Sequence, residues 1–145
     1  MKIKVICPVL IIFLFSLFLS DCENDNNVNN DNNVNCDSVL CTTEFRHIVI
    51  QINHKSDNTA FLLTNYKVIR VSDKINITIN DNNLTDNNGY YPITDDTKRD
   101  MFQNKNIEVE FTGYLNDALV IKKRFIVTAD CCHVHLVVGD TKFYI

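Results

Sequence analysis

Glycine and proline, which usually form the turns of a globular chain, are scarce in this sequence. It has 3 glycines, 2 prolines and no tryptophan in 145 residues, so glycine and proline cannot make most of its turns. Asparagine and aspartate are abundant instead, and both residues tolerate left-handed backbone and form Asx-turns. A basic stripe is also missing, since 14 Lys and Arg face 18 Asp and Glu for a formal charge of −4. We therefore expect no nucleic-acid partner, because no cluster of cations is present to neutralise phosphates.

Long hydrophobic runs are also absent. The longest run, residues 6–19, has about 14 residues and contains Pro8, whereas a spanning helix needs ~20. It follows two lysines and is followed by Cys22, and this order is typical of a secretory signal. We therefore predict a lipoprotein signal peptide over residues 1–21. The alternative is a buried helix or a permanent transmembrane span.

The residues that end at Cys22, L-S-D-C, resemble a bacterial lipobox, although Asp21 stands where Gly, Ala or Ser is usual. Acyl chains on this cysteine would bury CH2 groups worth ~0.8 kcal/mol each, which is enough for stable anchoring. We therefore predict lipidation at Cys22, and a place in the cell envelope, anchored to the outer membrane on its periplasmic or surface face. The membrane is thus the first expected partner, and a disulfide at Cys22 is the alternative.

Residues 22–35 consist almost entirely of Asn and acidic residues and contain an imperfect repeat of N-D-N-N-V-N. Such a segment buries too little apolar surface to offset the entropy of ordering it. We predict a disordered tether that spans roughly 20 Å as a flexible coil. It would hold the following domain away from the membrane surface.

Residues 36–145 show short β patterns and no convincing amphipathic helix. The clearest alternation is Lys74–Ile79, and the best hairpin joins Ile107–Tyr114 to Ala118–Thr128 through a tight turn at Asn116 and Asp117. About eight strands at 8–12-residue spacing predict an all-β domain, an antiparallel, immunoglobulin-like β-sandwich first and a small β-barrel second. The other expected strands are Phe45–Ile52, Ala60–Leu63, Tyr66–Val71, Tyr90–Ile93, Cys132–Val138 and Lys142–Ile145, and Thr94–Gln103 is expected to hold a loop with one helical turn.

Four cysteines remain in the mature domain: Cys36, Cys41, Cys131 and Cys132. An even number in a small exported domain favours disulfides. A bond between the two neighbours would strain the peptide, so we expect Cys36 and Cys41 to bond to the later pair, in either order. In a strand, adjacent side chains point to opposite faces, so each later cysteine would meet a different partner. Each bond closes about 90 residues, worth roughly 4.5 kcal/mol for the first bond in the chain-entropy model.

A metal site is the alternative for the segment C-C-H-V-H, in which His133 and His135 are expected on one face of a strand. Adjacent cysteines suit tetrahedral ligation poorly, so we expect neither a metal nor another cofactor. Disulfides would also remove the free thiolate that Cys–His catalysis requires. Two further sets are weaker candidates: paired acids for glycoside cleavage at Asp95, Asp96 and Asp130, and sugar-stacking rings at Tyr90 and Tyr91.

Two motifs, C-T-T-E-F-R-H-I-V-I at Cys41–Ile50 and A-D-C-C-H-V at Ala129–Val134, together resemble a group of uncharacterised lipoproteins from gut Bacteroidetes. The shared pattern is C-T-x-x-F with D-C-C-H-V, and the resemblance runs from Cys41 to Ile145. It implies an exported all-β domain and carries no activity.

We therefore expect a lipid-anchored, non-enzymatic binding or accessory domain, whose partner is a glycan or an envelope protein. One alternative is a metal-dependent protein or small enzyme that uses His133 and His135. Another is an adhesin or pilus-like subunit, because Phe143–Ile145 could offer an edge strand to a partner.

Overall fold

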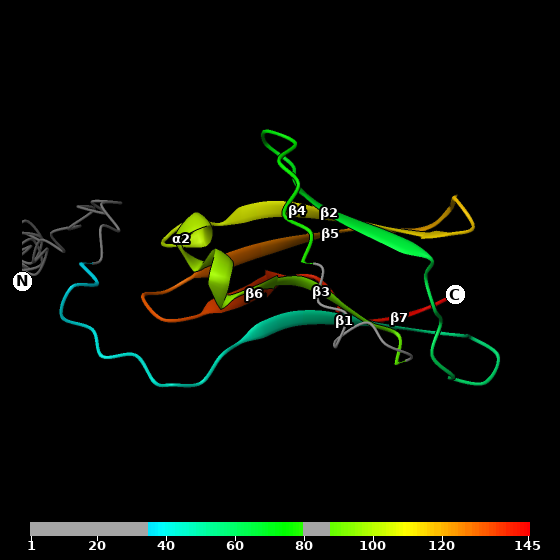
Figure 1. Cartoon of the computed structure of the whole chain (residues 1–145), viewed down its shortest axis with the longest axis horizontal. Coiled ribbons are helices and arrows are strands. Elements are labelled where there is room, and N and C mark those ends of the chain that lie inside the picture. The colour runs from blue at the N-terminus through cyan, green and yellow to red at the C-terminus, as the bar shows by residue number, and fades with distance from the viewer. Residues whose placement is uncertain (1–34, 80–87) are drawn as a thin grey trace, which may run out of the picture. The chain divides into compact units, whose positions relative to one another are not determined.

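The computed structural model describes residues 35–79 and 88–145, which form two open β-sheets packed face to face (Figure 1). One sheet has the strand order β3–β1–β7 and the other has the order β2–β4–β5–β6. The predicted all-β sandwich is confirmed, and the sheets do not close into a barrel. The strands are β1 His47–Asn53, β2 Asn65–Arg70, β3 Tyr90–Asp95, β4 Ile107–Leu115, β5 Ala118–Ala129, β6 Val134–Val138 and β7 Lys142–Tyr144.

The first four strands cross between the sheets in an immunoglobulin-like order. β1 is in one sheet and β2 in the other, after which β3 returns to pair with β1 and β4 returns to pair with β2. Strands B, C, E and F of an immunoglobulin sandwich follow the same alternation. Every strand pair is antiparallel except β1 with β7, which is parallel.

The last part of the chain changes sheet at Gly139. β6 pairs with β5, and after three residues β7 pairs with β1 of the opposite sheet. Gly139 has a φ of 131°, and a Cβ added there would lie 2.4 Å from the Phe125 ring. A residue with a side chain does not fit at position 139, because the positive φ disfavours any Cβ and the Phe125 ring occupies the space that the Cβ would need. Phe143 then packs edge-on against Phe125, with ring centroids 6.3 Å apart.

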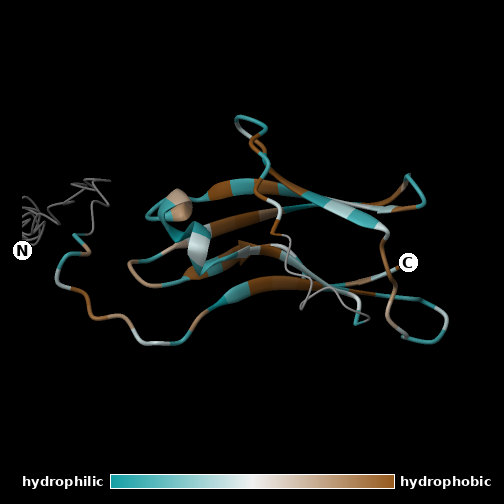
Figure 2. Cartoon of the chain, in the orientation of Figure 1, coloured by the Kyte–Doolittle hydropathy of each residue, from teal (hydrophilic) through white to brown (hydrophobic). Residues whose placement is uncertain are grey.

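Both sheets contribute side chains to one core, and the strands alternate apolar and polar residues in Figure 2. Val109 and Phe111 of the β4–β5 hairpin are fully buried in this core. A short 3-10 turn, η3 (Asp96–Lys98), and one helical turn, α2 (Arg99–Phe102), follow β3, where one helical turn was expected. Phe102 of α2 is fully buried and so extends the core beyond the strand ends.

The strand predicted at Lys74–Ile79 is wrong. Ile77 is buried, but Ile75 is 46% exposed, and only one bridge, between Ile69 and Asn76, joins the segment to β2. Lys74 has a positive φ of 62°, and the Asn76 side chain accepts hydrogen bonds from Thr78. These local turns break the ladder, because side-chain hydrogen bonds satisfy backbone groups that a strand would pair. Residues 60–63, also predicted as a strand, form only a bridge at Ala60.

The predicted signal peptide, the predicted lipidation site Cys22 and all but the last residue of the predicted tether lie outside the described residues. The described helices are both shorter than a membrane-spanning segment requires.

Candidate functional site

The turn Asp130–His133 joins β5 to β6 and gathers most of the candidate residues. Cys131 is bonded to Cys36 and Cys132 to Cys41, with S–S distances of 1.97 and 2.08 Å. The expected pairing of early with late cysteines is thus confirmed, in one of its two orders. The strand predicted to begin at Cys132 begins at Val134 instead. Both late cysteines therefore lie in the turn, next to the segment 35–46, which we call the strap.

Asp130 shapes this turn from within. Its Oδ1 accepts the backbone N–H groups of Cys132 and His133, both at 2.7 Å, and its Oδ2 lies 2.8 Å from Nε2 of His135. Burial raises the pKa of Asp130, but these hydrogen bonds outweigh burial and lower the pKa to about 2. Asp130 is therefore ionised at ordinary pH, and it fixes the backbone that carries both cysteines.

Asp96 holds the other side of the turn. Its Oδ1 accepts the N–H of Val134 at 2.9 Å, and its Oδ2 accepts the N–H of Arg46 and contacts Nδ1 of His133, both at 2.8 Å. Burial raises the pKa of Asp96, but the bond with His133 and the two backbone N–H groups lower it below its usual range. Nε2 of His133 lies 3.3 Å from Oγ1 of Thr42 on the strap. Asp96 thus joins three separate parts of the chain.

The prediction that His133 and His135 lie on one face of a strand is wrong. His133 precedes β6 and turns to Asp96, whereas His135 lies within β6 and bonds to Asp130. Among residues 35–79 and 88–145, no group of three or more His, Cys, Asp or Glu side chains is arranged to hold a metal ion. Each imidazole is therefore placed to act with one carboxylate, not with the other imidazole.

The remaining candidates have structural partners. Asp95 is buried and caps η3 by accepting the N–H of Thr97 at 2.9 Å. The hydroxyl of Tyr91 accepts the N–H of Leu63 at 2.7 Å and donates to the carbonyl of Phe61 at 2.9 Å. Tyr91 is therefore a core residue that anchors the segment after β1, and Tyr90 is 39% exposed.

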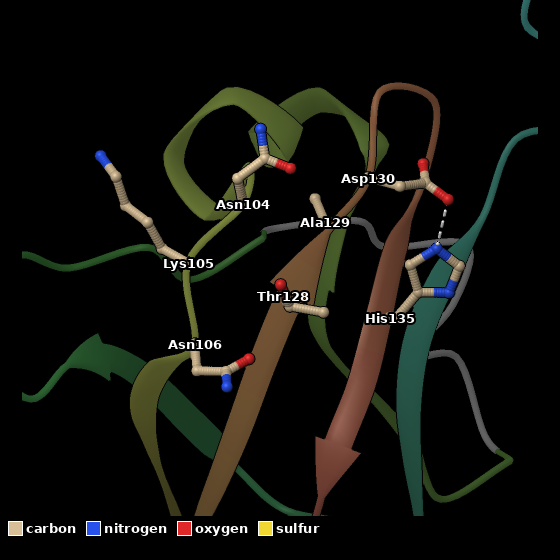
Figure 3. Close-up of a pocket in the computed structure, with 7 residues that line it drawn as sticks. All are labelled: Asn104, Lys105, Asn106, Thr128, Ala129, Asp130 and His135. Atoms are coloured by element: carbon tan, nitrogen blue, oxygen red, sulfur yellow. Dashed lines mark hydrogen bonds and ion pairs between the residues drawn. The ribbon is translucent and has the colours of Figure 1, made fainter. Parts of the chain in front are cut away.

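An open pocket of about 350 Å³ lies between the loop after α2 and the ends of β5 and β6 (Figure 3). The N–H of Asn104 donates to the carbonyl of Ala129 at 2.9 Å, which fastens the loop to β5. The lining residues carry amide, hydroxyl, ammonium, imidazole and carboxylate groups. The lining residues are Asn104, Lys105, Asn106, Thr128, Ala129, Asp130 and His135.

Sequence reasoning found Asp130 and His135 but missed the N-K-N run at 104–106 and Thr128. The one sequence signal that could have pointed to residues 104–106 was an Asn-rich turn directly after a predicted helical turn. The parallel bridge between Gln103 and Ala129, 26 residues apart, is what brings that turn to Asp130.

The depressed pKa of Asp130 predicts a loss of stability in acid. The stabilisation from ionised Asp130 is fully present above pH 3.8, the ordinary pKa of an aspartate. It is lost as the pH falls through the folded pKa of about 2. Its side chain is 58% exposed, so solvent screening limits the contribution to about 1 kcal/mol or less. Urea unfolding at pH 5 and pH 2.5 should show a smaller acid-induced loss for Asp130→Asn than for the unmodified chain. Asp117→Asn, in the β4–β5 turn, is the control. An equal loss in all three proteins would contradict the assignment.

The chain matches no protein-family model, and neither a curated protein nor a solved structure is significantly similar to it.

Proposed function

We propose that this chain is an exported, lipid-anchored, non-enzymatic binding domain of the bacterial cell envelope, and that its pocket binds a polyhydroxylated ligand such as a glycan. Two features support export: the N-terminal pattern that ends at Cys22, and two disulfides, which persist in oxidising compartments. The observation that carries the binding role is the open polar pocket beside the cross-linked turn.

The chemistry of the pocket fits hydroxyl groups. Asn104 and Asn106 each offer a donor and an acceptor, Lys105 offers donors only, and Thr128 offers both. The lining residues include no Phe, Tyr or Trp, so recognition would rest on hydrogen bonds and not on stacking. Lys105 and Asp130 carry opposite charges, which favours a neutral ligand over a strongly charged one.

Two of the lining residues, Thr128 and Asp130, are held in place by their neighbours. β5 supplies Thr128 and pairs with both β4 and β6, while Asp130 is fixed by two backbone N–H groups. The adjacent disulfides hold the same turn against the strap. A preformed site loses less entropy when a ligand binds, so modest hydrogen bonds suffice for measurable affinity.

Binding can be tested with the full chain on a panel of immobilised neutral and acidic glycans, followed by calorimetry on the best binder. The double variant Thr128→Val, Asn106→Ala should raise Kd at least tenfold, since it removes two hydrogen-bonding groups worth about 1 kcal/mol each. Thr112→Val, on β4 and outside the pocket, should leave Kd unchanged. Equal affinity of the double variant and the unmodified chain, or binding to no glycan, would refute this role.

The anchor is tested separately by cell fractionation. Cys22→Ser should move the protein from the membrane fraction to the soluble fraction, because the acyl chains attach to that thiol. Cys7→Ser, within the predicted signal peptide, should not change the fractionation. Retention of Cys22→Ser in the membrane fraction would rule out lipid on Cys22 as the anchor.

A further inference from the structure

Asp96, His133 and Thr42 form a continuous line of side-chain hydrogen bonds. Asp96 Oδ2 and His133 Nδ1 are 2.8 Å apart, and His133 Nε2 and Thr42 Oγ1 are 3.3 Å apart. The side chains of Asp96 and His133 are each only 10% exposed, whereas Thr42 lies on the exposed strap. The hydroxyl of an exposed residue is thus bonded to a pair of nearly buried groups.

The carboxylate determines which imidazole nitrogen carries the proton. Asp96 is an acceptor that two backbone N–H groups already hold in its ionised form. Nδ1 of His133 must therefore donate to Asp96, and in the neutral imidazole the lone pair of Nε2 then faces the hydroxyl of Thr42. This is the orientation in which a neutral imidazole acts as base toward a hydroxyl nucleophile, and such contacts are often loose before a substrate binds.

The disulfide Cys41–Cys132 fixes the two reacting groups relative to each other. Cys41 directly precedes Thr42, and Cys132 directly precedes His133, so one covalent bond joins the neighbours of both residues. The N–H of Arg46, bound to Asp96, holds the other end of the strap. The hydroxyl and its base are therefore preorganised, which removes part of the entropic cost of bringing them together.

We propose that Thr42 is an activated hydroxyl that accepts an acyl group from activated esters or thioesters, with His133 as base and Asp96 as positioning residue. In the step, Oγ1 of Thr42 attacks the donor's carbonyl carbon while Nε2 of His133 takes the hydroxyl proton. The bond to the leaving alcohol or thiol breaks, and that group departs with the proton. The products are an ester on Thr42 and the free alcohol or thiol. This self-modification is separate from ligand binding in the pocket, and it needs no turnover.

The test uses the full, disulfide-bonded chain and p-nitrophenyl acetate. Site-resolved mass spectrometry should find Thr42 acetylated about 10²-fold faster than Thr43, its exposed neighbour, which is the usual gain from a positioned base. Thr42→Ser should still be acetylated at position 42, and His133→Gln should reduce acetylation of Thr42 to the rate of Thr43. Equal rates at Thr42 and Thr43 in the unmodified chain would overturn the proposal without any variant.

The role of Asp96 needs a readout that packing alone would not change. In the unmodified chain, the Nδ1 proton of His133 should give a far-downfield proton resonance, because it is shared with a carboxylate. Asp96→Asn should remove that resonance and reduce acetylation of Thr42 at least tenfold. Unchanged acetylation in folded Asp96→Asn would rule out Asp96 as the positioning residue.

Discussion

Loss of both disulfides should reduce the free energy of unfolding by about 7 kcal/mol, whereas loss of either bond alone should cost only about 2.5 kcal/mol. The bonds span 95 and 91 residues, so the chain-entropy model gives each bond nearly the same stabilisation when it is considered alone. However, one bond already brings the strap to the turn Asp130–His133. The second bond then closes a ring of only about eight residues, from Cys36 to Cys41 and across Cys131 and Cys132, and little entropy is left for it to remove.

The comparison needs three variants: Cys36→Ser with Cys131→Ser, Cys41→Ser with Cys132→Ser, and all four together. Urea unfolding of each, with the slope monitored for changes in the denatured state, gives the three free energies. The two paired variants serve as controls for each other, because each keeps one of the two links. A loss of more than 4 kcal/mol in either paired variant would show that its bond does more than close the ring.

Gly139→Ala should lower the free energy of unfolding by about 3 kcal/mol or more. The φ of 131° is strained for any residue with a Cβ, and the new methyl group would lie 2.4 Å from the Phe125 ring. Because β7 follows three residues later, relief by movement of the backbone would pull β7 away from β1.

A double-mutant cycle with Phe125→Leu separates the two causes. Leucine lacks Cε1, the ring atom 3.0 Å from the added Cβ, and its methyl groups can turn away from residue 139, so part of the cost of Gly139→Ala should disappear in the Phe125→Leu background. The part that remains combines backbone strain with any residual contact. Full additivity of the two substitutions would show that contact with Phe125 contributes nothing.

The fold could be predicted where local chemistry decides it. The β4–β5 hairpin follows from alternation and from Asn116 and Asp117, whose positive φ values of 49° and 64° suit a tight hairpin turn. Local chemistry also explains the error at Lys74–Ile79, where an alternating pattern coexists with turn-forming side chains. Alternation alone does not show whether a neighbouring strand is available to pair.

The site depended on contacts that no local pattern reveals. Asp96 meets His133 across 37 residues, and Thr42 meets it across 91. The cysteines were the one long-range signal in the sequence, and they correctly brought the strap to the turn that holds His133. They could not show which carboxylate each histidine would bind, because that choice depends on whether β6 begins before or after His133.

The way the strap is bonded also bears on how the domain would respond to proteases. Leu40, 97% exposed, lies between two cysteines that are each bonded to the same turn. Cleavage beside Leu40 would break the main chain, yet Cys36 would still connect everything before it to Cys131. A protein anchored through its N-terminus would therefore not be shed by that cut until a reductant opened the Cys36–Cys131 bond.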